Sequence, residues 1–345
     1  MTPIYNQLLI PFLTAMVVAI TMGGSGTAPA FSASYGANVM RKSLIPGLFG
    51  IMVFVGAFLA GKKTASTMGS GILPAEYMDF TVVSIALFSI AVTMLISNIS
   101  GIPQSTSQAA VLALAAPALY FGRLDPHNLF VEIIPAWFIL PIISYFLSFF
   151  AGKYIYQPMR RRGLTIQRAQ NENKRHIWDI VLVIMALYVS FAIGSNNVAN
   201  AAGPLYTMTI NELHIRESDH IVILMLATLV VAPCFGIGAS LFGHKILKNT
   251  GKEIILFGKF EAVIIAFISG SLLLLASVVK GIPTSLVQVN VAAILGIGVA
   301  KMGHKNIFRK TQVKRFFTMW MIAPVISFLL SLLLIFLADK ANLLQ

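Results

Sequence analysis

Charged residues are scarce in this chain of 345 residues, and their scarcity excludes most classes of soluble protein. Only 11% of the residues are Asp, Glu, Lys or Arg, whereas 57% are hydrophobic and the mean hydropathy is +0.83. These values lie outside the range of soluble globular proteins and exclude a soluble enzyme. Because several apolar runs reach about 20 residues, we expect an all-α polytopic membrane protein in the cell (plasma) membrane.

Cysteine and metal-ligand patterns are also nearly absent. The single cysteine, Cys234, cannot form a disulfide within the chain, and the six histidines show no metal-ligand spacing. We therefore expect no metal, no cofactor and no catalytic residue. No cation precedes Arg41, so the first apolar run lacks the basic segment of a secretory signal peptide.

Acidic residues number 12 against 25 basic ones, which gives a net charge of +13. On a membrane protein such an excess marks cytoplasmic loops rather than a nucleic-acid partner. The basic stretch 153–176 is the strongest candidate for a cytoplasmic linker. Placing it inside puts most cations on the inner side and both termini outside.

Ten apolar segments divide into two groups of five around this linker, and we expect about ten full spans. The sequence predicts a first repeat at 1–152, the linker at 153–176 and a second repeat at 177–345. The apolar segments lie at about 4–22, 44–60, 80–99, 106–121, 129–152, 177–193, 221–243, 262–279, 286–300 and 316–338.

The two halves repeat each other in sequence. The stretch GIPQSTSQ at 101–108 matches GIPTSLVQ at 281–288, and WFILPIISYFLSFF at 137–150 matches WMIAPVISFLLSLL at 320–333. An odd number of spans per half forces the repeats into opposite orientations. Two inverted-topology repeats with broken or re-entrant helices are typical of secondary transporters, whose site lies near the midplane.

Four polar stretches rich in Gly or Pro interrupt the apolar pattern, at 22–38, 101–108, 194–204 and 281–290. Irregular backbone at membrane depth is tolerated only inside protein or beside a watery cavity. We expect helix N-termini to converge there and to form an anion site from unpaired N–H groups, without any lysine. The alternative for each Ser or Thr is a bond to its own helix backbone.

The candidate substrate-binding residues come from all four stretches. They are Gly24, Ser25, Gly26, Thr27, Ser105, Thr106, Ser107, Gln108, Ser195, Asn196, Asn197, Asn200, Thr284, Ser285 and Gln288.

Two further features of the sequence are a glycine-rich stretch and a few acidic residues at span edges. The stretch GGSG at 23–26 is only superficially like a phosphate loop, because no Lys-Ser or Lys-Thr follows. Glu261 and Lys259 lie at the edge of a span and are expected to form an interfacial pair, while Asp179 begins another span. Either acid is an alternative candidate for a proton relay.

Four of these motifs resemble signatures of the inorganic phosphate transporter family, the PiT or PHO4 group. GSNNVANA at 194–201 is similar to the family's G-[AS]-N-D-V-[AS]-N-A, with Asn197 in place of Asp. PQSTSQ and PTSLVQ are similar to P-[VI]-S-T-T-H, with Gln108 and Gln288 in place of His. Residues 23–31 are the most altered signature, since Ser25, Gly26 and Pro29 replace Asn, Asp and Asn.

The missing aspartates make the pattern most similar to the CysP-type sulfate permease branch, which implies proton coupling and a homodimer. Hydrogen phosphate has a proton to donate to a carboxylate, whereas sulfate has none at neutral pH. A carboxylate beside sulfate would be an unpaired like charge, so a donor-rich site without Asp permits sulfate. It does not exclude phosphate, selenate, molybdate or thiosulfate.

The expected function is therefore a secondary active transporter that imports sulfate by proton symport with alternating access. The partners would be sulfate or a related oxyanion, protons and the lipid bilayer. An inorganic phosphate symporter and a membrane oxyanion sensor that does not transport are the alternatives. A weak sodium site formed by unwound carbonyls, or a channel, also stays open.

Overall fold

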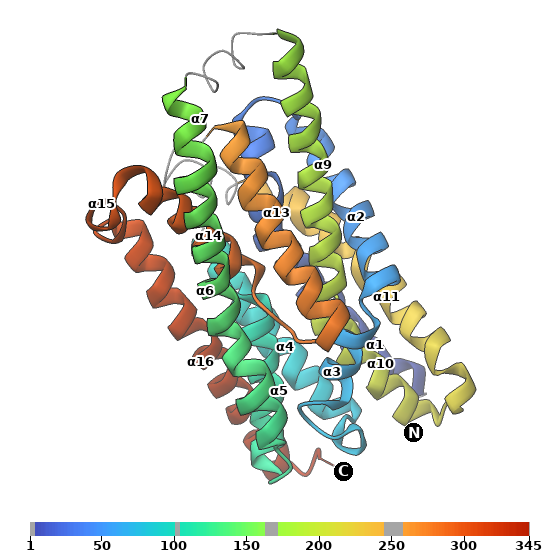
Figure 1. Ribbon diagram of the computed structural model, residues 1–345. Coiled ribbons are helices and arrows are strands. Elements are labelled where there is room, and N and C mark those ends of the chain that lie inside the picture. The colour runs from blue at the N-terminus through green and yellow to red at the C-terminus, as the bar shows by residue number, and fades with distance from the viewer. Residues whose placement is uncertain (1–3, 101–103, 163–171, 245–257, 345) are drawn as a thin grey trace.

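The computed structural model describes residues 4–100, 104–162, 172–244 and 258–344. Within these ranges the regular secondary structure is helical throughout, as Figure 1 shows. The middle of the expected linker and the Gly-Ile-Pro of the first GIPQSTSQ motif lie outside the described residues. So does the stretch 245–257, which contains three of the cations expected on the inner side.

Eight described stretches are long and apolar enough to cross a membrane, which confirms the expected all-helical polytopic architecture. Each contains one long helix, and α10 (Ala199–Leu213) continues the stretch that α9 begins. The long helices are α1 (Ile4–Gly36), α2 (Ile45–Ala60), α4 (Phe80–Ser100), α6 (Ile134–Phe150), α9 (Glu172–Asn197), α11 (His220–Leu241), α13 (Lys259–Leu275) and α16 (Thr311–Lys340).

Two of the ten expected spans are instead short helices, so the expectation of ten full spans is wrong in this respect. Helix α5 (Thr106–Tyr120) has 15 residues and α14 (Leu286–Met302) has 17. At 1.5 Å per residue they are about 22 and 25 Å long, short of the roughly 30 Å apolar core of a bilayer. In Figure 1, α14 lies toward the end of the molecule that holds α7 (Gln157–Arg161) and α15 (His304–Phe308), and α5 lies toward the opposite end.

The expected breaks differ between the two signature stretches. Helix α9 ends at Asn197 and α10 begins at Ala199, so the chain is interrupted there as expected. Helix α1 runs without interruption to Gly36, so the break expected from residue 22 onward is absent. The hydroxyls of Ser25 and Thr27 bond carbonyls of their own helix, and this local bonding is compatible with a continuous helix.

Two pairs of helices cross closely at glycine residues, α9 with α2 and α1 with α11. A Cβ on Gly194 of α9 would lie 2.0 Å from the backbone oxygen of Val53 on α2. A Cβ on Gly23 of α1 would lie 2.2 Å from the backbone oxygen of Phe235 on α11. Small residues let helix backbones approach this closely in membranes. The two crossings therefore occur at matching places in the two signature stretches.

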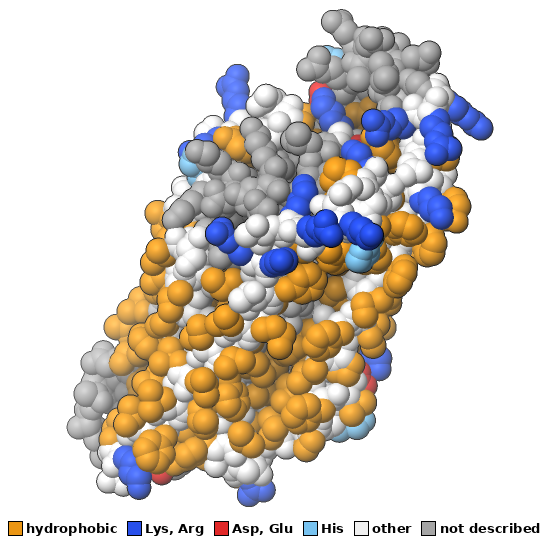
Figure 2. All heavy atoms as spheres, turned by 90° about the vertical axis from the view of Figure 1, so that its left-hand side faces the viewer, with side chains coloured by type: hydrophobic (Ala, Val, Ile, Leu, Met, Phe, Trp, Pro, Cys, Tyr) orange, Lys and Arg blue, Asp and Glu red, His pale blue; other side chains and the backbone are white. Residues whose placement is uncertain are grey.

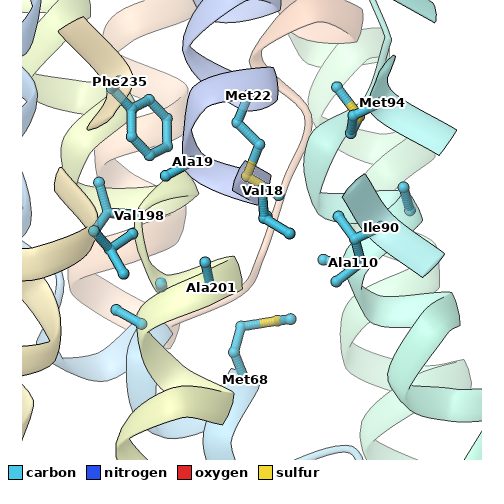
Figure 3. Packing of buried hydrophobic residues seen from close by; sticks show 14 of the residues in the cluster. Val18, Ala19, Met22, Met68, Ile90, Met94, Ala110, Val198, Ala201 and Phe235 are labelled. Atoms are coloured by element: carbon cyan, nitrogen blue, oxygen red, sulfur yellow. The ribbon is translucent and has the colours of Figure 1, made fainter. Parts of the chain in front are cut away.

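Other helix contacts in the first half of the chain also have counterparts in the second half. Helix α1 packs against α4 while α9 packs against α13, and α5 packs against α16 while α14 packs against α6. Figure 3 shows α1 inside the buried core, with side chains of α4, α10 and α11 around it. The labelled side chains of this core are Val18, Ala19, Met22, Met68, Ile90, Met94, Ala110, Val198, Ala201 and Phe235.

The surface is apolar around the middle of the molecule. Figure 2 shows one face, where hydrophobic side chains form a broad belt. On this face the Lys and Arg side chains gather toward the end where α7 and the start of α9 lie, and few lie beyond the other edge of the belt. Helix α1 begins and α16 ends toward that other edge (Figure 1).

Candidate functional site

The N-termini of α5 and α14 meet through a reciprocal pair of amides. Gln108 Nε2 donates to Gln288 Oε1 at 3.2 Å, and Gln288 Nε2 donates to Gln108 Oε1 at 2.9 Å. Each helix starts at a serine cap, because Ser105 Oγ accepts from Gln108 N and Ser285 Oγ accepts from Gln288 N, both at 3.3 Å. The partially positive ends of two helices thus face each other.

Asn196, near the end of α9, links this meeting point to the chain before α14. Its Nδ2 donates to Ser277 Oγ at 2.8 Å and to the Ile282 carbonyl at 2.9 Å. Its Oδ1 accepts from Thr284 N at 3.0 Å and from Ser107 Oγ at 3.3 Å. One buried side chain therefore joins α5, α9 and the irregular stretch 281–285.

Asn200 and Asn197 complete the group at the break between α9 and α10. Asn200 Nδ2 donates to Ser107 Oγ at 3.1 Å. The Oδ1 atoms of both asparagines are buried and accept no hydrogen bond from the described residues. Buried carbonyl oxygens call for a donor, such as water or a proton-bearing group, or for a cation.

We name the polar residues around this meeting point the amide cluster. Hydrogen bonds join them in two sets, one around the Gln108–Gln288 pair and one around Asn196, and Asn197 follows Asn196 in the chain. The members of the amide cluster are neutral, buried and drawn from both halves of the chain, with no carboxylate and no cation among them. They are Ser105, Ser107, Gln108, Asn196, Asn197, Asn200, Ser277, Thr284, Ser285 and Gln288.

The other candidate residues are buried and lie outside the amide cluster. Ser25 Oγ donates to Met22 O at 3.1 Å and Ser195 Oγ to Ala192 O at 2.8 Å, each within its own helix. Thr27 does the same toward the carbonyl four residues earlier, at 2.7 Å. Gly24 and Gly26 lie on α1, and Thr106 is the first residue of α5. The hydroxyls of Ser25 and Thr27 on α1 therefore bond their own helix backbone, which is the alternative given for each Ser or Thr.

Gln104 and Ser277 belong to this region, although the candidate list omits them. Gln104 lies within the repeated GIPQSTSQ motif, so its motif offered a signal that could have found it. It is 0% exposed, and both its amide atoms are unpaired among the described residues. Ser277 follows α13 in a π-helical turn and has no motif of its own, so no sequence signal distinguished it.

Ion pairs lie outside the amide cluster. Glu261 Oε1 accepts from Lys301 Nζ at 2.7 Å, and Glu261 is 2% exposed. Lys259 pairs with Asp179 instead. The expected pair of Glu261 with Lys259 is therefore wrong, because the end of α14 brings a lysine from 40 residues away that the sequence could not place.

Three cavities are lined by other residues. One of about 140 Å³ lies between α2, α9, α10 and α11, with Lys62 at its lining and Val198 of the helix break among its walls. The second, of about 510 Å³, is an open apolar groove at the surface where α2 crosses α11, and the third, of about 20 Å³, includes Asn290 in its lining. The Gln108 and Gln288 amides bond each other directly, so a guest between these two amides requires them to separate.

The described part of the chain offers no evident set of ligands for a resident metal ion. No group of three or more His, Cys, Asp or Glu side chains lies together there in a way that could hold a metal ion. The chemistry of the amide cluster is that of hydrogen-bond donors and acceptors, which suits binding rather than covalent catalysis.

Sequence comparisons relate this chain to anion permeases over nearly its whole length. Residues 22–331 match the model of the phosphate transporter family. The chain is 31% identical over 337 residues to the sulfate permease CysP of Bacillus subtilis (strain 168), which covers 97% of this chain and 89% of that protein. It is 23% identical over 402 residues to a putative phosphate permease of Thermococcus kodakarensis, covering 95% and 98% of the two chains. These matches confirm the resemblance drawn from the motifs.

The fold is similar to a solved structure named the sodium-dependent phosphate transporter. The TM-score is 0.83 at 19% sequence identity, and the match covers 97% of this chain and 99% of that one. At this identity the similarity establishes the fold, and it does not identify the substrate or the coupling ion of this chain.

Proposed function

The chain belongs to the phosphate transporter family, a family of transporters rather than enzymes, and from that membership we propose that it imports sulfate as a secondary active transporter. The observation that carries the proposal is the amide cluster, where two helix N-termini meet among neutral side chains. Unpaired backbone N–H groups and the helix dipoles favour an anion at such a place.

Sulfate fits the donor set of this cluster better than hydrogen phosphate does. Asn197 stands where a carboxylate could accept the proton of hydrogen phosphate, and its amide can instead donate to a fully deprotonated anion. A site built around one hydrogen-bonding pattern discriminates strongly against a ligand that leaves its groups unpaired. The 31% identical sulfate permease supports this choice, and inorganic phosphate remains the second candidate because other relatives are putative phosphate permeases.

Two inverted repeats, 1–152 and 177–345, joined by the linker 153–176, would provide alternating access. The helix contacts that correspond between the two halves, and the matched glycine crossings, support this division. Substrate would sit between α5 and α14, and relative movement of the halves would open and close the Gln108–Gln288 pair. Broken helices that point their N-termini at an anionic group are a recurring transporter device.

A coupling cation is required by charge. Moving a dianion inward against a negative interior costs about 2.3 kcal/mol per charge per 100 mV. Two or three protons would offset this cost, so we propose proton symport. The unpaired oxygens of Asn197 and Asn200 support a donor or cation beside the anion, which makes sodium the alternative to test.

The proposed setting is the cell membrane, with both termini outside and two copies associated as a homodimer. Figure 2 supports the orientation, because cations gather toward the end of the molecule where the linker attaches.

Uptake of labelled sulfate into proteoliposomes, driven by an imposed pH gradient, tests the proposal. We expect uptake that needs the gradient, competition by selenate and molybdate, weaker competition by phosphate, and no requirement for sodium. A protein that binds sulfate without uptake under any gradient would be an oxyanion sensor, and stronger competition by phosphate would favour the phosphate symporter.

A further inference from the structure

Two buried polar side chains directly before the capped starts of α5 and α14 have no hydrogen-bond partner in the described chain. Gln104 is 0% exposed, and its Oε1 and Nε2 are both unpaired. Thr284 is 1% exposed, and its Oγ1 is unpaired. Burying such groups without partners is unfavourable, and the great majority of buried polar groups in proteins are satisfied.

The two side chains occupy equivalent positions in the repeated motif, because each immediately precedes the serine that caps its helix. Both positions lie at the amide cluster. The backbone N of Thr284 donates to Asn196 Oδ1 at 3.0 Å. Ser107, three residues after Gln104 in the chain, bonds Asn196 at 3.3 Å and Asn200 at 3.1 Å.

Resting on the proposed function, we propose that Gln104 and Thr284 are direct ligands of the transported oxyanion, one from each half of the chain. A primary amide and a hydroxyl can each turn a hydrogen toward the ligand, and a tetrahedral oxyanion without a proton offers only acceptors. The ligand is thus the fully deprotonated class of oxyanion, and the two side chains add to the N–H groups at the helix ends.

Lack of a partner does not by itself make a ligand, as two other buried hydroxyls show. Thr64 on α3 (Lys62–Ser70) and Ser148 on α6 are also unpaired among the described residues. Neither precedes a helix N-terminus that enters the amide cluster. The location of Gln104 and Thr284, and their correspondence across the repeat, distinguish them from these two.

Gln104→Leu and Thr284→Val test the proposal in the full-length protein reconstituted into vesicles. We expect the KM for labelled sulfate to rise about 10- to 100-fold in each variant, the effect of losing a hydrogen bond to a charged group. Thr284→Ser keeps the hydroxyl and should stay within about threefold of the wild type. The matched control is Thr93→Val on α4, whose hydroxyl bonds Ser89 O at 2.8 Å, and its KM should not change.

Thermal unfolding of each variant in detergent separates a ligand role from a structural one. Replacing an unpaired buried polar group by an apolar one of similar shape should leave the unfolding midpoint unchanged or raise it. The proposal is overturned if both variants keep the wild-type KM, or if they lose uptake together with a lowered midpoint.

Failure of the proposed function gives a different result, namely no oxyanion uptake by the wild type. Sulfate binding to the purified protein, followed by calorimetry, then decides the ligand role by itself. Weaker binding by Gln104→Leu supports the proposal, and equal binding contradicts it.

Discussion

Replacing Asn196 with alanine should destabilise the protein as well as stop transport. Its side chain makes four hydrogen bonds, to Ser277, Ile282, Thr284 and Ser107. Ser277 Oγ also donates to a carbonyl of its own helix at 2.9 Å, so its hydroxyl keeps a partner in the variant. The backbone groups of Ile282 and Thr284 lose the hydrogen bonds described here.

The magnitude follows from these two backbone groups. A buried donor or acceptor left unpaired costs about 1–3 kcal/mol, so the variant should lose about 2–6 kcal/mol of unfolding free energy. Asn196→Asp keeps the acceptor for Thr284 N but buries a carboxylate whose second oxygen would face the Ile282 carbonyl, so its loss should be at least as large. Both variants should also take up sulfate poorly, because the chain before α14 is held by this side chain.

The assay is thermal unfolding of the purified protein in detergent, with labelled sulfate uptake measured on the same preparation. The control is Asn306→Ala, which removes one hydrogen bond, to Met302 O at 2.8 Å, on an exposed helix surface. Its unfolding free energy should change by less than about 0.5 kcal/mol. If Asn196→Ala unfolds at the wild-type midpoint, Asn196 does not hold residues 281–285 in place.

The remaining predictions concern selectivity, helix crossing and a buried charge. Asn197→Asp should weaken sulfate uptake and strengthen competition by phosphate; unchanged sulfate uptake would remove Asn197 from the site. Gly194→Ala should prevent normal folding, because the new Cβ would lie 2.0 Å from a backbone oxygen of α2, whereas Gly47→Ala, with nothing within 4 Å, should fold normally by size-exclusion chromatography. Glu261→Gln should lower the unfolding free energy by about 3 kcal/mol because its lysine partner is largely buried, and the exposed pair of Glu132 should lose less than about 1 kcal/mol in Glu132→Gln. Equal unfolding midpoints for these two variants would contradict the burial argument.

Hydropathy predicted the helices because each apolar run must satisfy its backbone internally in a bilayer. It could not tell that 106–121 and 286–300 are short helices rather than full spans. The composition of both segments resembles that of a membrane-spanning helix. Only the helix bounds show that each begins directly after a serine cap.

The repeated motif was the strongest predictor of the candidate site. Ser105 and Ser285 hold equivalent caps, and Gln108 and Gln288 bond each other, as symmetry between repeats would favour. A motif shared by two halves restricts where both copies lie, which a single polar residue does not. Ser277 shows the limit, because a lone serine in an apolar run gives no such restriction.

Helix α1 shows where the pattern of Gly and Pro misled, because the break expected from it within residues 22–38 is absent up to Gly36. Its stretch 23–31 is the most altered signature, and the helix passes through it unbroken. The hydroxyls of Ser25 and Thr27 find carbonyls within one turn, an option that Asn196 does not take because its amide reaches four groups outside its own helix. Side-chain reach, rather than the motif pattern, separates the two copies.

The location of a bound oxyanion in crystals of the protein shows whether the amide cluster is the binding site. Selenate has the shape and charge of sulfate, and its selenium can be located by anomalous diffraction. We expect a selenium peak between the N-termini of α5 and α14, within hydrogen-bond reach of amide-cluster side chains. A peak confined to the cavity beside Lys62, with none at the amide cluster, would contradict this expectation.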